Sequence, residues 1–360
     1  MLNSKTEALG IIFPNSYDAM VPELASERLM ASIPFASRYR MCDFILSSMV
    51  HSGIDNISII VRKNYHSLLD HLGAGREWDL VRKNGGLNIV PPFAQKQVKV
   101  FEGRIEALES LRGYLLKQSQ KYVIMTDANI AINFDFNELL DAHIKSGADV
   151  TMMYRKQEIP KAYIHQSRER MDLYYALGMN GDRVSKIYIN PTEEGEMNFS
   201  MNIYVVEREF LIHMIDDAYV HGHTYFVRDI LDKQIDRLDI RGFCYDGYVV
   251  NIHDTQSYFE ENMRLLQEEN LNALFSPNQI YTKIRDDNPT RYVAGSSVKN
   301  SLLADGCVIE GTVENCVLFR GCQVKKGAVV KNCVLMQDTV VETDCGVESV
   351  SYTHLTLPTT

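Results

Sequence analysis

The sequence lacks the features of membrane-bound, secreted and nucleic-acid-binding proteins. No apolar run approaches the ~20 residues that a membrane-spanning helix needs, and the start of the chain lacks the basic and long apolar stretches of a signal peptide. The seven cysteines are an odd number without a CxxC pair, so thiols in a reducing cytoplasm fit better than a disulfide framework. A formal charge of −10 repels phosphate backbones. We therefore expect a cytoplasmic protein with no membrane and no nucleic-acid partner.

The 360 residues have an ordinary globular composition and are long enough for two domains. In the first part of the chain, short apolar runs alternate with stretches of helical spacing. This alternation predicts an α/β domain whose parallel sheet is covered by helices on both faces, with ligands bound at the carboxyl ends of the strands. The apolar runs expected as strands are Leu9–Phe13, Ile57–Val61, Tyr122–Met125, Val150–Tyr154 and Ile203–Val206.

From about residue 293, a period of six residues replaces this alternation. Small side chains recur in phase, as at Cys316, Cys322 and Ala328. Short strands that repeat every six residues indicate a parallel β-helix. Five of the seven cysteines lie in this segment, where they either form a metal cluster or fill the coil interior. The second interpretation is favoured because the cysteines follow the six-residue period and not a ligand spacing.

The junction between the two parts carries its own pattern. Apolar spacing over residues 256–275 predicts one amphipathic helix that bridges the domains, and Ser276, Pro277 and Asn278 end it. The last ten residues break the six-residue period and are interpreted as a non-native tail that adds no coil. The predicted order is an α/β domain over 1–265, a linker helix and loop over 266–284, a β-helix domain over 285–350 and the tail over 351–360.

Several segments together carry a resemblance to a known family. They are Ile33–Ser48, Tyr65–His71 with Gly75–Leu80, Asn133–Phe136, Ser200–Val205 and Gly247–Tyr248. In this order they resemble the bacterial glucose-1-phosphate adenylyltransferases (ADP-glucose pyrophosphorylases). The residues of the Arg38-Tyr39-Arg40 run resemble the GlgD-type branch of that family. The resemblance implies a Rossmann-like nucleotidyltransferase domain with a mostly parallel sheet, followed by a C-terminal left-handed parallel β-helix of hexapeptide repeats.

The family reaction joins ATP and glucose 1-phosphate into ADP-glucose and pyrophosphate. The resemblance therefore implies a glycine-rich backbone cradle for the triphosphate, a basic side chain on the phosphates, and carboxylates that hold Mg²⁺. The cradle should follow the first strand. However, no glycine occurs between Gly10 and Gly53, and Pro14 removes one N–H donor. We therefore expect no normal triphosphate cradle.

The basic and metal-binding positions are altered as well. Met30 stands where active relatives place a lysine. Asp127 matches the magnesium-binding aspartate at the end of a family strand, but the second carboxylate of the family is Asn251 here, and a neutral amide brings no charge to Mg²⁺. Asp254 could replace that carboxylate only if the strand end bulged. Arg28 lies two residues from Met30, but its direction would be wrong for the phosphates on a fixed backbone.

The substrate pocket implied by the resemblance is only partly present. The lysine that would pair with glucose 1-phosphate is Asn190. Each lost electrostatic contact costs roughly 10²–10³-fold in rate, so we expect an inactive or weakly active chain. The positions that remain as remnants of the substrate or nucleotide pocket are Gly10, Gly103, Ala107 and Gly178.

Two arginines stand out on this acidic chain. The resemblance implies that Arg38 and its neighbour Arg40 belong to a regulatory site for anions such as sugar phosphates, and the guanidinium fork suits phosphate. The alternative is a structural salt bridge with Asp43 or another acid. A chain that loses catalytic groups and keeps its fold resembles a regulatory subunit.

Three functions follow from these observations. The first is a regulatory or weakly active subunit that forms a hetero-tetramer with a catalytic glucose-1-phosphate adenylyltransferase homologue, packs through its β-helix and binds a sugar-phosphate effector. Mg²⁺ would then belong to the catalytic partner, and none is expected in this chain. The second is an active nucleotidyltransferase with a metal site rebuilt on Asp127 and Asp254. The third is a sugar-phosphate sensor without catalysis.

Overall fold

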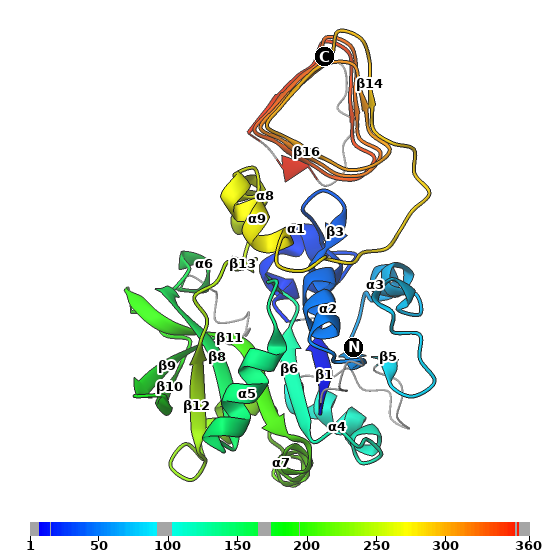
Figure 1. Ribbon diagram of the computed structural model, residues 1–360. Coiled ribbons are helices and arrows are strands. Elements are labelled where there is room, and N and C mark those ends of the chain that lie inside the picture. Colours follow the sequence, from blue (N-terminus) through cyan, green and yellow to red (C-terminus); the bar gives the residue numbers. More distant parts are fainter. Residues whose placement is uncertain are drawn as a thin grey trace.

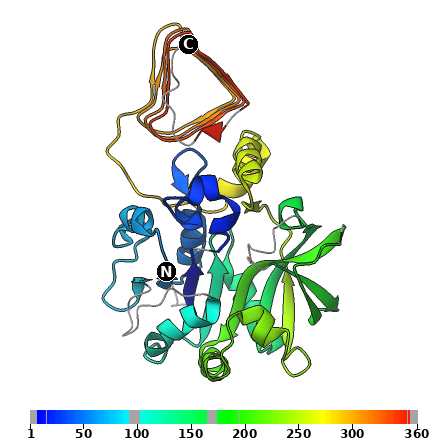
Figure 2. The same cartoon turned by 180° about the vertical axis from the view of Figure 1, so that it is seen from behind.

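The computed structural model describes residues 7–14, 16–91, 103–164, 174–193, 195–349 and 351–352. An α/β domain lies at one end of the molecule and a triangular prism of parallel strands at the other, with two short helices between them (Figure 1). A connector without regular structure runs along the outside from these helices to the prism, which is also visible from behind (Figure 2). This arrangement confirms the predicted fold class.

One mixed sheet of nine strands forms the centre of the α/β domain. Its first half is parallel, with β1 between β4 and β6, and β11 then runs antiparallel to both of its neighbours. In spatial order the strands are β5 (Gly86–Val90), β4 (Asn56–Ile60), β1 (Ala8–Phe13), β6 (Tyr122–Asp127), β11 (Glu196–Glu207), β8 (Val150–Glu158), β12 (Ile240–Cys244), β10 (Arg183–Ile189) and β9 (Tyr175–Asn180).

Helices cover both faces of this sheet because the strands are apolar on both sides. In β1, Leu9 and Ile11 face one core while Ala8 and Ile12 face the other. The helices of the first core are α4 (Arg104–Leu115), α7 (Arg208–Val220) and η4 (Phe226–Leu231), and those of the second are α2 (Met41–His51), α3 (His66–Leu72) and α5 (Phe136–Ser146). In the described part of the chain, none of the helices is both long and apolar enough to span a membrane.

Short elements complete the domain, several of them beyond the carboxyl edge of the sheet. The β2–β3 hairpin, which pairs Phe35 with Tyr39, projects from this edge toward the prism (Figure 1). These elements are η1 (Asp18–Met20), α1 (Pro22–Ala25), η2 (Met30–Ser32), β2 (Pro34–Phe35), β3 (Tyr39–Arg40), η3 (Arg76–Trp78), β7 (Ile130–Ala131), α6 (Lys161–Ile164) and β13 (Val250–Asn251).

The prediction of one helix over 256–275 was wrong. The segment forms two helices, α8 (Thr255–Arg264) and α9 (Glu268–Phe275). Between them the backbone tightens to hydrogen bonds from residue i+3 to residue i, as from the N–H of Leu266 to the carbonyl of Met263 (3.1 Å). The tightened turn coincides with Leu265, whose side chain is buried in a core that also contains residues of the β-helix. Burial of this apolar side chain therefore outweighs continuous helix propensity.

The prism is a left-handed parallel β-helix with three sheets. The first sheet contains β14 (Arg291–Tyr292), β17 (Val308–Ile309), β20 (Gln323–Val324) and β23 (Val340–Val341). The second contains β15 (Ser297–Lys299), β18 (Thr312–Glu314), β21 (Val329–Lys331) and β24 (Gly346–Glu348). The third contains β16 (Leu302–Leu303), β19 (Val317–Leu318), β22 (Val334–Leu335) and β25 (Ser351–Tyr352).

The end of the β-helix differs from the prediction. Residues 351–352 pair in parallel with Val334 and Leu335, so the statement that residues 351–360 add no coil was wrong for the first two of them. Residues 353–360 lie outside the described part of the chain. The cysteine interpretation agrees with the structure, because Cys307, Cys316 and Cys322 are fully buried among the apolar residues of the coil interior.

The third sheet joins the β-helix to the α/β domain. Its outward residues Val317 and Val334 share one apolar core with Phe44, Tyr258 and Leu274 of the α/β domain and the two bridging helices. The hydroxyl of Tyr258 also donates a hydrogen bond to the carbonyl of Pro34 (2.8 Å), at the base of the β2–β3 hairpin. The two domains therefore have a fixed relative position.

Gly103, which directly precedes α4, and Gly113, within α4, provide a test of how this helix packs in the α/β domain. A Cβ on Gly103 would lie 2.3 Å from the carbonyl oxygen of Thr224, whereas a Cβ on Gly113 would meet nothing within 4 Å. We expect Gly103→Ala to lower the free energy of unfolding by about 1–3 kcal/mol and Gly113→Ala to raise it by about 1 kcal/mol. Urea unfolding followed by circular dichroism measures both, and shifts of the two midpoints in the same direction would contradict the packing described.

Candidate functional site

The predicted nucleotide site lies where β1 and β6 end side by side. Phe13 and Asp127 are register partners at the carboxyl ends of these two strands. Ser16 and Tyr17 follow, and Tyr17 adopts a left-handed backbone conformation (φ 67°) without being glycine. Open α/β sheets bind ligands outside the carboxyl ends of their strands.

Asp127 is held by the protein itself. The carboxylate is 1% exposed, and its Oδ1 accepts hydrogen bonds from Nη2 of Arg104 (2.6 Å) and from the hydroxyl of Ser16 (2.7 Å). The guanidinium of Arg104 lies 4.6 Å from the ring centroid of Phe13. Burial alone would lower the pKa of Arg104, but the charge of Asp127 raises it above its ordinary value. The result is a buried ion pair at the position of the expected metal ligand.

This environment does not fit Mg²⁺. A metal on Asp127 would face the guanidinium of Arg104, and the two positive charges would repel each other at close range. The other carboxylate oxygen, Oδ2, is buried and has no hydrogen-bond partner among the described residues, but a single free oxygen is a poor site for an ion that prefers several oxygen ligands.

Asn251 lies in a different small cavity. β13 pairs it with Ile130 of β7, and its side-chain oxygen accepts a hydrogen bond from the amide of Asn129 (3.2 Å). Asn251 lines a cavity of about 20 Å³ together with Tyr17 and Tyr163, and Asp127 is not among the residues that line it. Such a volume holds one or two waters by the usual measure. Asp254, the alternative ligand, caps α8 by accepting a hydrogen bond from the N–H of Ser257 (2.6 Å).

The two positions that replace the family lysines have structural surroundings. Met30 is fully buried, and its N–H donates to the carboxylate of Asp18 (2.7 Å). Asn190 has φ 48°, and its side-chain oxygen accepts from the N–H of Tyr174 (2.9 Å). At both positions, these hydrogen bonds therefore stabilise the local backbone conformation. Arg28 lines another pocket, in agreement with the expectation that it points away from the phosphates.

The pocket remnants are packing positions. A Cβ on Gly10 would lie 2.6 Å from Sδ of Met49, so this glycine allows α2 to lie close to β1. Gly103 allows contact with Thr224, as described above. Ala107 is buried in the core beneath α4, and Gly178 lies in β9 against Lys186 and Tyr188 of the neighbouring strand.

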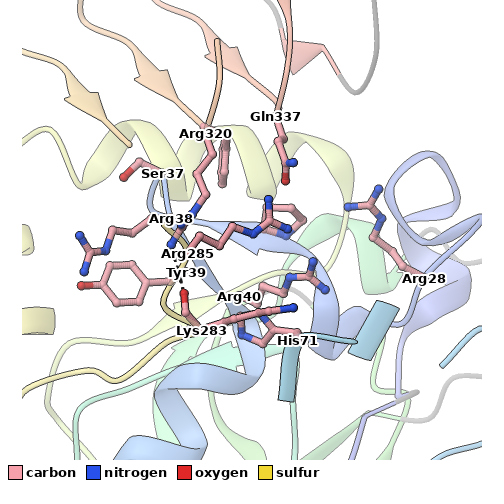
Figure 3. Close-up of a pocket in the computed structure, with 12 residues that line it drawn as sticks. Arg28, Ser37, Arg38, Tyr39, Arg40, His71, Lys283, Arg285, Arg320 and Gln337 are labelled. Carbon is pink, nitrogen blue, oxygen red and sulfur yellow. Dashed lines mark hydrogen bonds between the residues drawn. The ribbon is translucent and has the colours of Figure 1, made fainter. Parts of the chain in front are cut away.

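A strongly basic pocket lies between the two domains (Figure 3). It has a volume of about 40 Å³ and is lined by segments that are far apart in the sequence. The hairpin contributes Arg38 and Arg40, and the β-helix contributes Arg320. The six cationic residues that line it are Arg28, Arg38, Arg40, Lys283, Arg285 and Arg320.

Half of these cations have a carboxylate partner. Arg38 lies 3.8 Å from Asp305, Lys283 lies 3.0 Å from Asp70, and Arg320 lies 3.2 Å from Asp287. The alternative interpretation of Arg38 is therefore partly right, although the acid is Asp305 of the β-helix and not Asp43. The remaining cations, Arg28, Arg40 and Arg285, form no ion pair within the described ranges.

Arg40 lies at the centre of this charge. Its Nη1 donates to the carbonyl and hydroxyl of Ser67 (2.8 and 2.7 Å). Burial lowers the pKa of Arg40, and the neighbouring charges of Arg28 and Arg285 lower it further. Three clustered guanidinium groups that repel one another gain stability from an anion between them.

The loop that presents these arginines is strained. Ala36 and Ser37 have φ values of 51° and 67°, which cost free energy in residues with a Cβ. The amide oxygen of Asn262 on α8 accepts a hydrogen bond from the N–H of Ala36 (3.1 Å) and holds the loop. A bridging helix therefore fixes the conformation that places Arg38 and Arg40 in the pocket.

A second, larger hollow adjoins the basic pocket. It has a volume of about 400 Å³ and shares Arg285, Arg320 and Gln337 with the first. Asn288 of the connector and Arg291 of β14 line it as well. The size is within the range of small-molecule sites.

A buried group of possible metal ligands lies beneath the basic pocket. Cys42, Asp43 and His71 have donor atoms within 4.8 Å of one another. The ring nitrogen Nε2 of His71 and the carboxylate of Asp43 already form a hydrogen bond of 2.6 Å, and burial raises the pKa of the Cys42 thiol well above its ordinary value. The thiolate that a metal needs is therefore disfavoured, and the group is best explained as internal hydrogen bonding.

Comparison with known proteins agrees with the two-domain fold. The family model described as nucleotidyl transferase matches residues 23–268. The chain belongs to this family. A second model, described as GlmU-like, C-terminal hexapeptide, matches residues 284–351.

Members of the nucleotidyl transferase family that are similar over most of the chain fall into two groups. A glycogen biosynthesis protein GlgD of Bacillus subtilis (strain 168) is 33% identical and covers 90% of this chain and 83% of the relative. A GlgD protein of Geobacillus stearothermophilus is 35% identical, covering 89% of this chain and 82% of the relative. A glucose-1-phosphate adenylyltransferase of the same organism is 29% identical, covering 91% and 84%.

Sequence reasoning missed several members of both sites. Arg104 lies 23 residues from Asp127 in sequence, and no local pattern pairs them. Lys283 and Arg285 reach the basic pocket from the connector, and Arg320 reaches it from the β-helix, so their convergence depends on the tertiary fold. The sequence signal for these residues is a cluster of basic side chains in an otherwise acidic chain.

Restoring one carboxylate should not restore a metal site. We expect Asn251→Asp to release no pyrophosphate from ATP and glucose 1-phosphate and to bind no Mg²⁺ in calorimetry, because Arg104 still neutralises Asp127. The matched control is Asn129→Asp, which places a carboxylate next to the same cavity. Turnover by Asn251→Asp but not by Asn129→Asp would show that the ion pair is no barrier to catalysis.

Proposed function

We propose that this chain serves glycogen biosynthesis as a non-catalytic or weakly active subunit of a glucose-1-phosphate adenylyltransferase. The observation that carries the proposal is the Arg104–Asp127 ion pair, in which a guanidinium stands at the expected metal ligand. The similarity to GlgD proteins and to glucose-1-phosphate adenylyltransferases supports the same assignment. Catalysis would then depend on a homologous partner that holds Mg²⁺ at its own site, most simply in a cytoplasmic hetero-tetramer.

The basic pocket supports a regulatory role for this subunit. Three guanidinium groups that form no ion pair with a described residue attract a compact anion to one place on a chain of charge −10. Arginine binds phosphate in a bidentate manner, and the adjoining hollow has room for a sugar attached to such a phosphate. A sugar phosphate therefore fits the two hollows better than inorganic phosphate alone.

The position of the pocket suggests how an anion would act. Arg40 directly precedes α2, Arg28 follows α1, and Arg320 belongs to the β-helix, so one anion would contact both domains. Binding would favour the arrangement in which these elements lie closest together. Coupling to a partner follows if the partner binds that arrangement preferentially.

The experiment that tests the function measures pyrophosphate release by this chain alone, by the catalytic homologue alone and by the two together. We expect no robust turnover by the isolated chain and a higher rate or an altered effector response in the mixture. Robust turnover by the isolated chain would instead favour a rebuilt active site. No effect on the homologue and no co-purification would favour a sensor without a catalytic partner.

Anion binding has its own prediction. We expect the double variant Arg28→Gln/Arg285→Gln to bind a sugar bisphosphate at least ten-fold more weakly in calorimetry, because two of the three unpaired charges are removed. Arg82→Gln is the control, since this arginine pairs with Asp55 and Asp79 away from the pocket. Equal affinity in the double variant and the control would rule out the basic pocket as the anion site.

A further inference from the structure

The outward surface of the second β-helix sheet carries a row of alternating charges. The third residues of β15, β18, β21 and β24 are aligned by parallel pairing: Lys299 with Glu314, Glu314 with Lys331, and Lys331 with Glu348. The middle residues of these strands include Val313 and Val330, which are buried in the coil interior. The flanking residues therefore point outward, because side chains alternate along a strand.

The row is straight and rigid. Directly after it, Asn300, Asn315 and Asn332 turn the corner with positive φ values. Their side-chain amides bond to one another along the stack, from Asn300 to Asn315 (2.8 Å) and from Asn315 to Asn332 (3.3 Å). Within the row, Nζ of Lys331 lies 3.3 Å from Glu314. The charges are therefore held in order at the strand spacing of about 4.8 Å.

The rest of this face carries mostly small side chains. Its second row of outward residues is Ser297, Thr312, Val329 and Gly346, and Val329 is 38% exposed. The third sheet, in contrast, is covered by the α/β domain. The second sheet is thus a face on which another surface can lie close to the backbone.

We propose that this face binds the same face of a second copy of the chain. We call the four strands of this sheet its rungs. A two-fold axis that runs parallel to the strands, midway between the two faces, reverses the order of the rungs in the partner subunit. The same axis places each row of side chains opposite the same row of the partner subunit. Lys299 then faces Glu348 of the partner subunit, and Glu314 faces Lys331 of the partner subunit. The order Lys-Glu-Lys-Glu is complementary to its own reverse, so all four rungs meet an opposite charge.

Other arrangements satisfy the charges less well. A two-fold axis along the coil stack would place the charged row opposite the row of small residues. A uniformly acidic or basic partner would meet two like charges among the four rungs, which disfavours binding. The four rungs span only about 14 Å at the strand spacing, so we expect a weak dimer, populated at high protein concentration and sensitive to salt.

The test inverts the row without removing its alternation. The variant Lys299→Glu/Glu314→Lys/Lys331→Glu/Glu348→Lys keeps alternating charges along its own stack and is again complementary to its own reverse. We expect the wild type and the inverted variant each to form a homodimer in sedimentation velocity at ~100 µM, and a tagged wild-type chain to capture wild type but not the inverted variant. In a mixed pair all four rungs would be like-charged.

Two further measurements complete the design. The variant Glu314→Lys/Glu348→Lys makes the row uniformly basic and should be monomeric at the same concentration, with thermal unfolding monitored to confirm that it is folded. Raising the salt from 50 mM to 500 mM should dissociate the wild-type dimer. Capture of the inverted variant by wild type, or a wild-type chain that stays monomeric at low salt, would overturn the proposal. No substrate or catalytic homologue takes part, so this result is independent of the proposed function.

Discussion

The ion pair between Arg104 and Asp127 determines which chemistry is available at the carboxyl ends of β1 and β6. A buried carboxylate needs a positive charge nearby, and in this chain the first residue of α4 supplies it. The same contact orders the end of β1, because Ser16 binds the same carboxylate oxygen and Phe13 lies beneath the guanidinium. The domain keeps the fold of its nucleotidyl transferase family, while the carboxylate at the end of β6 is neutralised by a side chain of the same domain.

The positive charge of the molecule is concentrated elsewhere. The hairpin, the connector and one β-helix corner bring cations to the boundary between the domains, and among the described residues half of the six cations that line the pocket have a carboxylate partner. This repulsion and the backbone strain at Ala36 and Ser37 both destabilise the folded state. Apolar packing around Phe44 and Tyr258 offsets that free energy. Strain and unpaired charge in one place are common features of ligand-binding sites.

Much of the fold could be predicted from the sequence, because its determinants are local. Apolar runs located the strands, and the six-residue period located the β-helix. The break at Leu265 could not be foreseen, since it depends on a core shared with the β-helix. The residue types at Met30 and Asn251, which differ from the family pattern, could be identified from the sequence one position at a time. The pairing of Asp127 with Arg104 could not, because it depends on where α4 begins relative to β6.

The shared core beneath the third sheet makes the two domains mutually dependent. A coil residue such as Val334 belongs to the same apolar cluster as Phe35, which lies in the hairpin that carries Arg38 and Arg40. Removing the prism would expose that cluster to water and release the arginines from the geometry in which they converge. In this chain the β-helix therefore helps to hold the conformation of the basic pocket, although most of the pocket's arginines and its lysine come from outside the β-helix.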